Sequence, residues 1–291
     1  MGRRKRPNRS PESTETPAQR GAILSLVTHT ISLVSIKFPE VAAGDAIRIS
    51  ATTYIAFKKC PSSANARLQG VYGPDTRPAF LGSLAHAVFS RHLTAGPIAP
   101  DDFVQACREE IGKSNLNHKM ASLDMKPAEI TAAIEEVRAL YERFTLLPGE
   151  GFEGSEVSIE NEPAEGVQLV GKVDAVYRED DGGHRLVDWK TGELGSPEDQ
   201  LLFYALLWLL DRDDLPAYVE AVSVRTGERY RTVPSSEDLG LVAEELAEMI
   251  NALREAWKAR SDLELRGGPW CSYCPLLPEC EEGQSAEALL G

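Results

Sequence analysis

The segment from Val167 to Gly192 constrains the fold more than any other part of the chain. "VQLVGKVDAVYRE" and "HRLVDWKTG" are each typical of a β-strand, and the "DDGG" between them predicts a tight turn, so the two strands should form a hairpin. Such a hairpin brings Asp174 beside Asp188 on adjacent strands. Because side chains alternate along a strand, Asp188 and Lys190 share one face and Trp189 lies on the other. The core side of the hairpin therefore carries three charged groups.

These charged groups need partners, because burying an unpaired charge costs several kcal/mol (on the order of 2–7 even for a neutral polar group). A metal ion meets that need, and two carboxylates with a carbonyl oxygen suit Mg or Mn. Lys190, close to such a metal, could orient or deprotonate a water molecule and stabilise charge on a phosphate. An exposed Asp–Lys ion pair is the alternative that a D-x-K pattern alone would favour.

The rest of the chain predicts a mixed α/β core over about 150–262, preceded by a helical region over 48–147. A short helix should follow Ser50 as its cap, and "AFLGSLAHAVFSRHL" predicts a longer one. Strands are expected in "SEVSIENE" and in a hairpin around Thr226-Gly227. "SPEDQLLFYALLWLLD" predicts a buried helix with Ser196 as cap and Pro197 at its first position. A long amphipathic helix follows in "SEDLGLVAEELAEMINALREAWKAR".

Charge limits the possible partners. The chain has 291 residues, of which 26% are charged, and its net charge of -14 argues against a general polyanion binder. A nucleic-acid enzyme remains compatible, because metal ions and a local basic groove can supply positive charge. Residues 1–20 begin with five basic residues among ten, and we expect a disordered basic arm that is either solvated or contacts nucleic acid. Gly21–Ile36 is too short and polar to span a membrane, so it is predicted to pack on the domain of a cytoplasmic protein.

The five cysteines are Cys60, Cys107, Cys271, Cys274 and Cys280, and three of them lie in the last 21 residues. An odd number with this distribution is a poor disulfide framework but a good start on a metal site. Cys60 is the best candidate for a fourth ligand beside the three C-terminal thiols. Spacing alone does not separate zinc from an iron–sulfur cluster, since both accept four thiolates. Cys107 is expected to be a small buried residue.

Four sequence motifs in a fixed order carry a family resemblance. "LGSLAHAVF" with Gly82 and His86 precedes "GKVDAV" and "LVDWKTG", and "QLLFYALLW" with Gln200 and Tyr204 follows. Over residues 48–282 the chain resembles the RecB-like branch of the PD-(D/E)XK nuclease superfamily. The resemblance implies a restriction-endonuclease-like core, with a mixed central sheet flanked by helices, an N-terminal helical region and a C-terminal cysteine-rich cluster segment. It also implies one nuclease domain over 21–282, a cluster segment over 266–282 and a tail over 283–291.

The resemblance also assigns roles to individual residues. The implied metal ligands are the side chains of His86, Asp174 and Asp188 together with the Trp189 main-chain carbonyl. Lys190 would be the catalytic lysine. Gln200 and Tyr204 share one helix face and would support the lysine and contact DNA. Glu156 either matches a further acidic position of the family or is a solvated strand residue.

The cysteine layout resembles nucleases of the AddB type and CRISPR-associated adaptation nucleases. These proteins carry one cysteine before the nuclease core and three after it, and the four hold a 4Fe-4S cluster. The resemblance implies the same cluster on Cys60, Cys271, Cys274 and Cys280, with zinc as the alternative. A group held by both ends of the core would tie those ends together.

The function implied is a metal-dependent DNA exonuclease that uses Mg or Mn, acts on single-stranded ends and serves DNA repair or recombination. A CRISPR adaptation nuclease that trims prespacers is the alternative, although the D-x-K motif and the chain length favour the RecB-like form. A catalytically inactive iron–sulfur or zinc module that binds DNA is the alternative of another class. The chain has no phosphate-binding loop of the Gly-x-x-x-x-Gly-Lys type. A helicase or CRISPR adaptation proteins would therefore be separate partners, and no membrane partner is expected.

Overall fold

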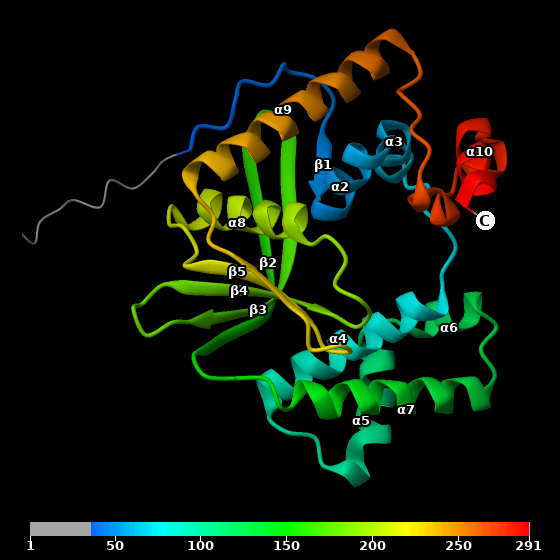
Figure 1. The fold of residues 1–291 in the computed structure, drawn as a ribbon, viewed down its shortest axis with the longest axis vertical. Coiled ribbons are helices and arrows are strands. Elements are labelled where there is room, and N and C mark those ends of the chain that lie inside the picture. Colours follow the sequence, from blue (N-terminus) through cyan, green and yellow to red (C-terminus); the bar gives the residue numbers. More distant parts are fainter. Residues whose placement is uncertain (1–35, 291) are drawn as a thin grey trace, which may run out of the picture. The chain divides into compact units, whose positions relative to one another are not determined.

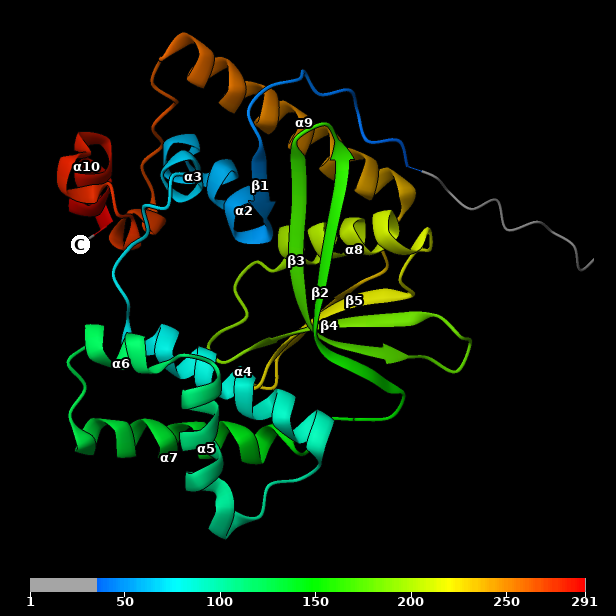
Figure 2. The same cartoon turned by 180° about the vertical axis from the view of Figure 1, so that it is seen from behind.

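The computed structural model of the chain describes residues 36–290 (Figures 1 and 2). The expectations for residues 1–20, and for nearly all of the segment 21–36, lie outside the described residues. The strands are β1 Ile47–Ser50, β2 Phe152–Ala164, β3 Val167–Arg178, β4 His184–Lys190, β5 Tyr218–Ser223 and β6 Arg229–Thr232. The α-helices are α2 Ala51–Lys59, α3 Pro61–Leu68, α4 Arg77–Ala95, α5 Phe103–Lys113, α6 Asn117–Ser122, α7 Pro127–Phe144, α8 Glu198–Arg212, α9 Ser236–Ala259 and α10 Glu281–Leu290.

The six strands form one mixed sheet. Five of them follow the order β1-β3-β4-β5-β6. The sixth, β2, also pairs with β3. The pairs β1·β3 and β4·β5 are parallel, whereas β2·β3, β3·β4 and β5·β6 are antiparallel. The predicted hairpin of β3 and β4 is present, and the expectation of an α/β core with a mixed central sheet flanked by helices is confirmed.

Strand β1 was not predicted from the sequence. It is only four residues long, and it pairs in parallel with the first residues of β3, from Ile47↔Val167 to Ser50↔Val170. Ser50 does cap the following helix, as expected, because its Oγ accepts a hydrogen bond from the Thr53 N–H at 3.3 Å. The segment that the sequence assigned to a helical region thus contributes an outer strand to the central sheet.

Helices cover both faces of the sheet with two separate apolar clusters. On one face α2, α8 and α9 contribute residues such as Tyr54, Phe203 and Leu246. On the other face α4, α5 and α7 contribute Phe89, Phe103 and Phe144, and Trp189 of β4 joins them. Figures 1 and 2 place α9 on the opposite side of the strands from α5 and α7. Trp189 therefore lies on the face away from α8, as strand alternation predicts.

Helix α8 begins one residue later than the sequence predicts. Pro197 is the N-cap rather than the first helical residue, and no side chain caps this end, so the expectation of Ser196 as cap is wrong. Pro197 has φ -85° and ψ -6°, and its carbonyl accepts the Leu201 N–H at 3.0 Å. The helix ladder therefore starts from the Pro197 carbonyl, and the Ser196 side chain lies outside it.

The C-terminal residues form a helix where the sequence predicted a tail. After α9, two short 3₁₀ turns over Pro269–Tyr273 and Leu277–Glu279 lead into α10, which runs across the expected boundary at residue 282. This segment returns to the start of α3, where Ser62 Oγ donates to the Leu263 carbonyl at 2.8 Å. Sequence positions about 200 residues apart are thus held together at this point.

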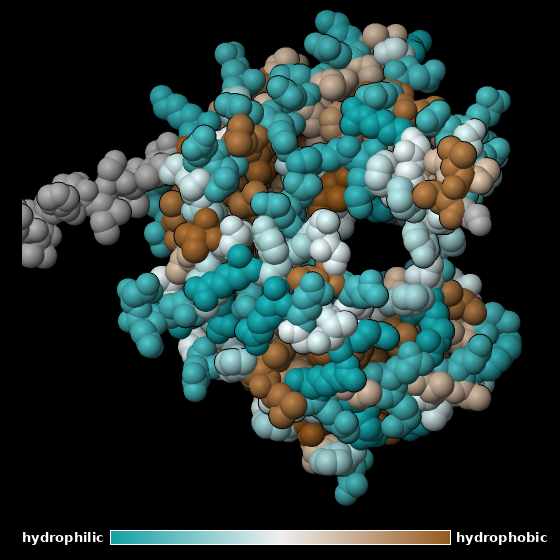
Figure 3. All heavy atoms as spheres, viewed as in Figure 1, coloured by the Kyte–Doolittle hydropathy of each residue, from teal (hydrophilic) through white to brown (hydrophobic). Residues whose placement is uncertain are grey.

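Hydrophilic residues cover most of the face shown in Figure 3, and apolar residues form only scattered patches on it. The same view shows an opening between the atoms of the C-terminal segment and those of α4, beside α2. Among the helices of residues 36–290, none combines the length and the apolar character that crossing a lipid bilayer would require.

Candidate active site

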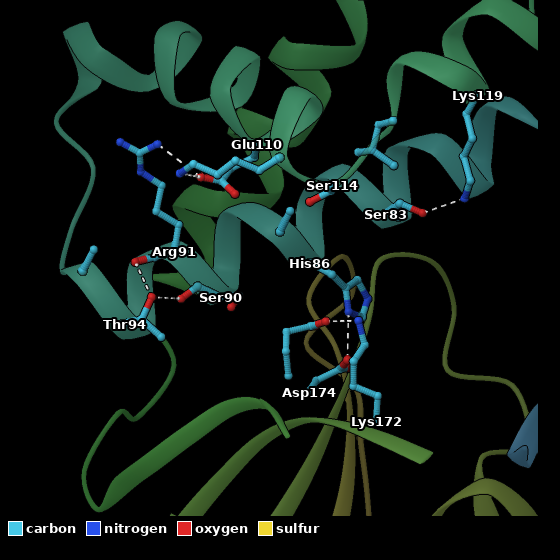
Figure 4. A pocket seen from close by; sticks show the side chains of 16 residues that line it. Ser83, His86, Ser90, Arg91, Thr94, Glu110, Ser114, Lys119, Lys172 and Asp174 are labelled. Atoms are coloured by element: carbon cyan, nitrogen blue, oxygen red, sulfur yellow. Dashed lines mark hydrogen bonds and ion pairs between the residues drawn. The ribbon is translucent and has the colours of Figure 1, made fainter. Parts of the chain in front are cut away.

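The residues singled out in the sequence meet at the end of β4. Strand β4 ends with Asp188, Trp189 and Lys190, and β3 contributes Asp174 from the neighbouring position. Helix α4 supplies His86 from one side, and Figure 4 shows its ring above Asp174 and Lys172. Helix α8 supplies the remaining two side chains, Gln200 and Tyr204, one turn apart on the same face.

Asp174 is held by two contacts. Its Oδ1 lies 3.0 Å from His86 Nδ1, and its Oδ2 accepts the Trp189 main-chain N–H at 2.7 Å. The β3·β4 ladder runs up to Ala175↔Val187, so Asp174 and Asp188 occupy the next positions along the two strands. Helix α4 and strand β4 are therefore both joined to this carboxylate.

A second network fixes Asp188 and Lys190. Lys190 Nζ donates to Gln200 Oε1 at 2.7 Å and lies 2.7 Å from Asp188 Oδ2. The Gln200 amide nitrogen donates to Asp188 Oδ1 at 2.8 Å and to Tyr204 Oη at 2.9 Å. Gln200 thus bridges the carboxylate, the ammonium and the phenol, and it orients all three before any ligand binds.

Burial and neighbouring charge shift the protonation of the site. Burial raises the pKa of Asp188 to about 6, and the nearby Asp174 carboxylate adds to that shift while Lys190 opposes it. Burial alone would lower the pKa of His86, but the carboxylate of Asp174 outweighs it and the pKa is raised. Burial raises the pKa of Tyr204, so its hydroxyl stays protonated. The site therefore holds more negative charge than its own residues stabilise.

Glu156 belongs to this site, a question that the sequence left open. Among residues 36–290, the only group of three or more His, Cys, Asp and Glu side chains whose ligand atoms lie within 4.8 Å of one another is His86, Glu156 and Asp174. Glu156 has φ +53°, a left-handed conformation that costs about 1–2 kcal/mol outside glycine. The register of β2 on β3 explains why Glu156 lies at the site. The flanking pairs Ser155↔Ala175 and Val157↔Val173 put residue 156 opposite residue 174.

The donor set fits a hard divalent cation such as Mg or Mn. Carboxylate oxygens and one imidazole converge, and Asp188 Oδ2, although close to Lys190, is buried without a well-formed hydrogen bond. The amide and carbonyl of a strand residue point to the same neighbouring strand, so the Trp189 carbonyl lies on the Asp174 side like its N–H. The residues that could hold the cation are His86, Glu156, Asp174 and Asp188, with the Trp189 carbonyl.

Two cavities meet at these ligands. The larger, of about 860 Å³, runs along α4 towards α5 and α6, and Figure 4 shows it. Its basic lining residues are Arg91, Lys113, Lys119 and Lys172. The smaller, of about 440 Å³, extends past Lys190 and Gln200 to Ser50 and Thr52. Both cavities share His86, Lys172 and Asp174, so they form one groove with the ligands in the middle.

The groove contains positive charge despite the acidic composition of the chain. Three of its four basic side chains are neutralised by carboxylates: Arg91 pairs with Glu109 at 2.6 Å, Lys113 with Glu110 at 2.8 Å, and Lys172 with Glu156. Lys119 donates to Ser83 Oγ at 2.9 Å and, within residues 36–290, pairs with no carboxylate. A polyanionic strand would therefore meet one unpaired cation, Lys119, and three cations that it would share with carboxylates on the α4 side of the ligands.

The cysteines gather at a second place. Cys60 is at the junction of α2 and α3, and it lines one small cavity together with Cys271, Cys274 and Cys280. Their sulfurs do not form a group as tight as the carboxylates at the active site. Cys107 is fully buried elsewhere, and burial raises its thiol pKa to about 12. The fifth cysteine is therefore an unreactive core residue, as expected.

Main-chain amides point at two of the four sulfurs. The Gly268 N–H donates to Cys271 Sγ at 3.4 Å, and the Gly283 N–H donates to Cys280 Sγ at 3.3 Å. A Cβ on Gly283 would lie 3.4 Å from Cys280 Sγ and 3.6 Å from Cys271 Sγ, so a glycine leaves room there. Amide donors stabilise thiolate charge, which suits a metal or an iron–sulfur cluster.

Comparison with known proteins identifies the family. Residues 48–281 match the family model of the PD-(D/E)XK nuclease superfamily, and the chain belongs to that superfamily. A solved structure from Eubacterium rectale, described as a candidate exonuclease, has the same fold with a TM-score of 0.53 and 12% identity, over 80% of this chain and 87% of that one.

A further solved structure, described as SSO0001, is 14% identical over 82% of this chain and 88% of that one, but its TM-score of 0.37 is too low to indicate a shared fold. No curated protein matches this chain closely enough to count as a relative. The family model therefore supports a nuclease, and the solved structure supports the fold.

Proposed function

We propose that this nuclease is a divalent-metal-dependent exonuclease that hydrolyses DNA phosphodiesters at single-stranded ends. The observation that carries the proposal is the convergence of His86, Glu156, Asp174 and Asp188 around one point beside Lys190. A metal-free binding module would gain nothing from this arrangement, because the buried carboxylates repel one another. Every position that the chemistry needs is filled, which argues against an inactive module.

Each residue of the site has a separate role in the proposed hydrolysis. The imidazole and the carboxylates would hold a Mg or Mn ion, which when bound supplies positive charge at the scissile phosphate. Lys190 would orient the attacking water and stabilise charge on the phosphate oxygens. Gln200 holds Lys190 and Asp188 in register, and Tyr204 holds Gln200. Gln200 and Tyr204 are therefore positioning residues in this proposal.

Two features support a strand end as substrate. The groove holds cationic groups on the α4 side and hydroxyl groups of Ser50, Thr52 and Thr191 on the other side. A backbone that crosses it would pass the ligands between phosphate contacts. The walls also come close, since a Cβ on Gly82 would lie 3.3 Å from Thr191 Oγ1. The exonuclease class rests on the RecB-like resemblance.

We also propose a 4Fe-4S cluster on Cys60, Cys271, Cys274 and Cys280. A tetrahedral zinc ion holds its thiolates about 3.8 Å apart, given Zn–S distances of about 2.3 Å. These sulfurs do not form so tight a group, which favours a cluster whose ligand sulfurs lie farther apart than those of one zinc ion. Such a cluster would fix α3 to the C-terminal segment.

A role in DNA repair or recombination follows from the RecB-like resemblance, with prespacer trimming as the alternative. The two roles require different neighbours, because repair needs a helicase that exposes single strands and trimming needs an integrase. Genes adjacent to this one would separate the roles.

Cleavage of end-labelled DNA tests the activity. Linear single-stranded, linear double-stranded and circular single-stranded DNA should be incubated with the protein in Mg, Mn or EDTA. We expect mononucleotides or short products from linear single strands with either metal, and none in EDTA. Cleavage of the circular strand at the same rate would contradict the exonuclease, and activity unchanged in Lys190→Ala would contradict the site.

The cluster has its own test. Protein purified without oxygen should absorb broadly near 400 nm and contain about four irons and four acid-labile sulfides per chain. A colourless protein with one zinc per chain would instead establish the zinc alternative.

A further inference from the structure

A third cavity lies between β1 and α3, beside the active-site groove. Its volume is about 370 Å³, which is in the range of small-ligand sites. Arg48, Arg67, Tyr72 and Trp257 line it, and it shares Ser50 and Val170 with the smaller active-site cavity. The three cavities therefore follow one another along the surface, with the ligands of the active site between the first and the second.

Local sequence rules place Arg67 and Tyr72 together. Helix α3 ends in a turn in which Gly70 has φ +77°, a conformation that glycine adopts without strain. The Val71 N–H donates to the Ala66 carbonyl at 2.8 Å, and the Gly70 N–H donates to the Arg67 carbonyl at 3.0 Å. This is the Schellman pattern of helix ends. It turns the chain back, so that Tyr72 lines the same cavity as Arg67.

Arg67 has unsatisfied hydrogen-bond donors. Its Nε is buried and has no acceptor in the described part of the chain, and no carboxylate of residues 36–290 lies within ion-pair distance. Arg48, in the same lining, is by contrast paired with Glu160 at 2.6 Å. The Arg67 side chain is only half-buried and lines the cavity, so an anion there would pair with its guanidinium, which has no ionic partner among the described residues.

Tyr72 offers an aromatic face to the same space. Its side chain is 66% exposed, so it contributes little to the core. Trp257 closes the cavity from α9 and is fixed there, because its indole N–H donates to Asn65 Oδ1 at 2.8 Å. Proteins bind single-stranded nucleic acids with these two kinds of group. A cationic side chain binds a phosphate, and an exposed aromatic ring stacks on a base.

We propose that this cavity is a nucleotide subsite of the substrate strand, in which Arg67 binds a phosphate and Tyr72 stacks on a base. The inference rests on the proposed function, since it needs a DNA strand in the active-site groove. It adds a place where the strand is held beside the point of cleavage rather than at it. Arg67 and Tyr72 thereby measure substrate length, because a strand too short to leave the groove would not reach them.

Binding of oligothymidylates of 4 and 14 nucleotides tests the subsite. Fluorescence anisotropy of labelled strands should be recorded with Lys190→Ala protein in Mg, so that no cleavage occurs. The parent protein should bind the 14-mer more tightly than the 4-mer. Tyr72→Ala should weaken the 14-mer by about tenfold, as expected for one stacked base, and reduce the preference for the longer strand.

The salt dependence separates the two residues. Arg67→Ala should reduce the slope of log affinity against log salt by about 0.7, the value for one phosphate contact to a single strand. Arg67→Lys should keep that slope, and Tyr72→Phe should keep the affinity. Arg212→Ala is the charge control and Leu146→Ala the exposed apolar control, since neither residue lines the three cavities. Both controls should match the parent.

Three results would contradict the subsite. If the parent prefers the 14-mer and both Arg67→Ala and Tyr72→Ala keep that preference, the subsite is wrong and the proposed function stands. If Arg67→Ala lowers the Tm without changing binding, another part of the chain fills the cavity. If wild-type protein neither binds nor cleaves any strand, the proposed function and the subsite fall together.

Discussion

The active site and the cysteine cavity are both sets of ligand-type side chains from distant parts of the chain, yet they are held differently. At the active site each carboxylate already has a protein partner, such as His86 for Asp174 and Gln200 for Asp188. At the cysteine cavity the thiols contact two amides and some weak acceptors, and they do not contact one another closely. The first arrangement is set by the fold, and the second depends on the group that it would bind.

The two sites should therefore respond differently when a residue is substituted. Removing a residue of the active site should abolish chemistry and leave the fold intact, because helices and sheet hold the site from all sides. Removing a cysteine should weaken the fold, because the proposed cluster would itself link α3 to the C-terminal segment.

The largest effect should come from Lys190→Ala. We expect the rate of strand cleavage to fall by about 10³-fold, in the range of general acid–base and charge-stabilising groups, while the Tm changes little. Rates on end-labelled single strands and thermal melts measure both quantities. Lys258→Ala, an exposed lysine at the end of α9, is the control. A fall in Tm that parallels the loss of rate would mean that Lys190 acts through the fold.

Cys271→Ala should show the opposite pattern. We expect loss of the cluster absorbance and a Tm lower by roughly 5–10 °C, with part of the cleavage rate retained. Cys107→Ala is the matched control, because that thiol is equally buried but lines another core. It should keep the absorbance of the wild type. An unchanged Tm in Cys271→Ala would show that the cavity does not link the two segments.

The pH dependence of metal-free protein tests the charge stored in the active site. Asp188 has a raised pKa of about 6, so the native state binds its proton more tightly than the unfolded chain, and stability is lost as pH rises towards and through 6. The raised pKa of His86 acts in the same direction. We expect unfolding in EDTA to be easier at pH 8 than at pH 5, with Asp188 contributing about 1.4 kcal/mol, because pH 5 lies about one unit below its folded pKa.

Denaturant titrations of wild type and Asp188→Asn at both pH values measure that contribution. The difference between pH 5 and pH 8 should shrink in Asp188→Asn, and Mg should restore the stability of the wild type at pH 8. An equal pH difference in both proteins would contradict the assignment to Asp188.

Glu156→Gln should weaken metal binding by about tenfold, because it removes one charge from the ligand group but keeps its shape. The Mn concentration that gives half-maximal cleavage measures this effect. Glu153→Gln, on the same strand and paired with Arg178, is the control and should need no more Mn than wild type. No change in Glu156→Gln would place Glu156 outside the metal site.

Tyr204→Phe should have the smallest effect. It removes one hydrogen bond to the Gln200 amide, which keeps its bond to Asp188, so we expect about a threefold lower rate at unchanged KM. Gln200→Ala should cost more, because it releases Lys190 and Asp188 together. Equal losses in the two variants would show that Tyr204 contacts DNA directly.

Much of the site was visible in the sequence because its signals are local. Alternation along β4 separates Trp189 from Asp188 and Lys190, and the four-residue spacing in α8 joins Gln200 to Tyr204. Local signals failed at three places. Strand β1 is too short to show a period, Ser196 is a plausible cap that Pro197 displaces, and α10 follows a segment whose turns suggested a tail.

The order of the elements and the chemistry of the strand ends follow from the amino-acid sequence alone, since both depend on neighbours a few residues apart. Only the tertiary structure brought Glu156 to His86 and Asp174, Cys60 to the C-terminal thiols, and Arg67 into line with the groove. These contacts join positions from 18 to more than 200 residues apart. They are set by how helices and strands pack over the whole domain, which no local pattern encodes.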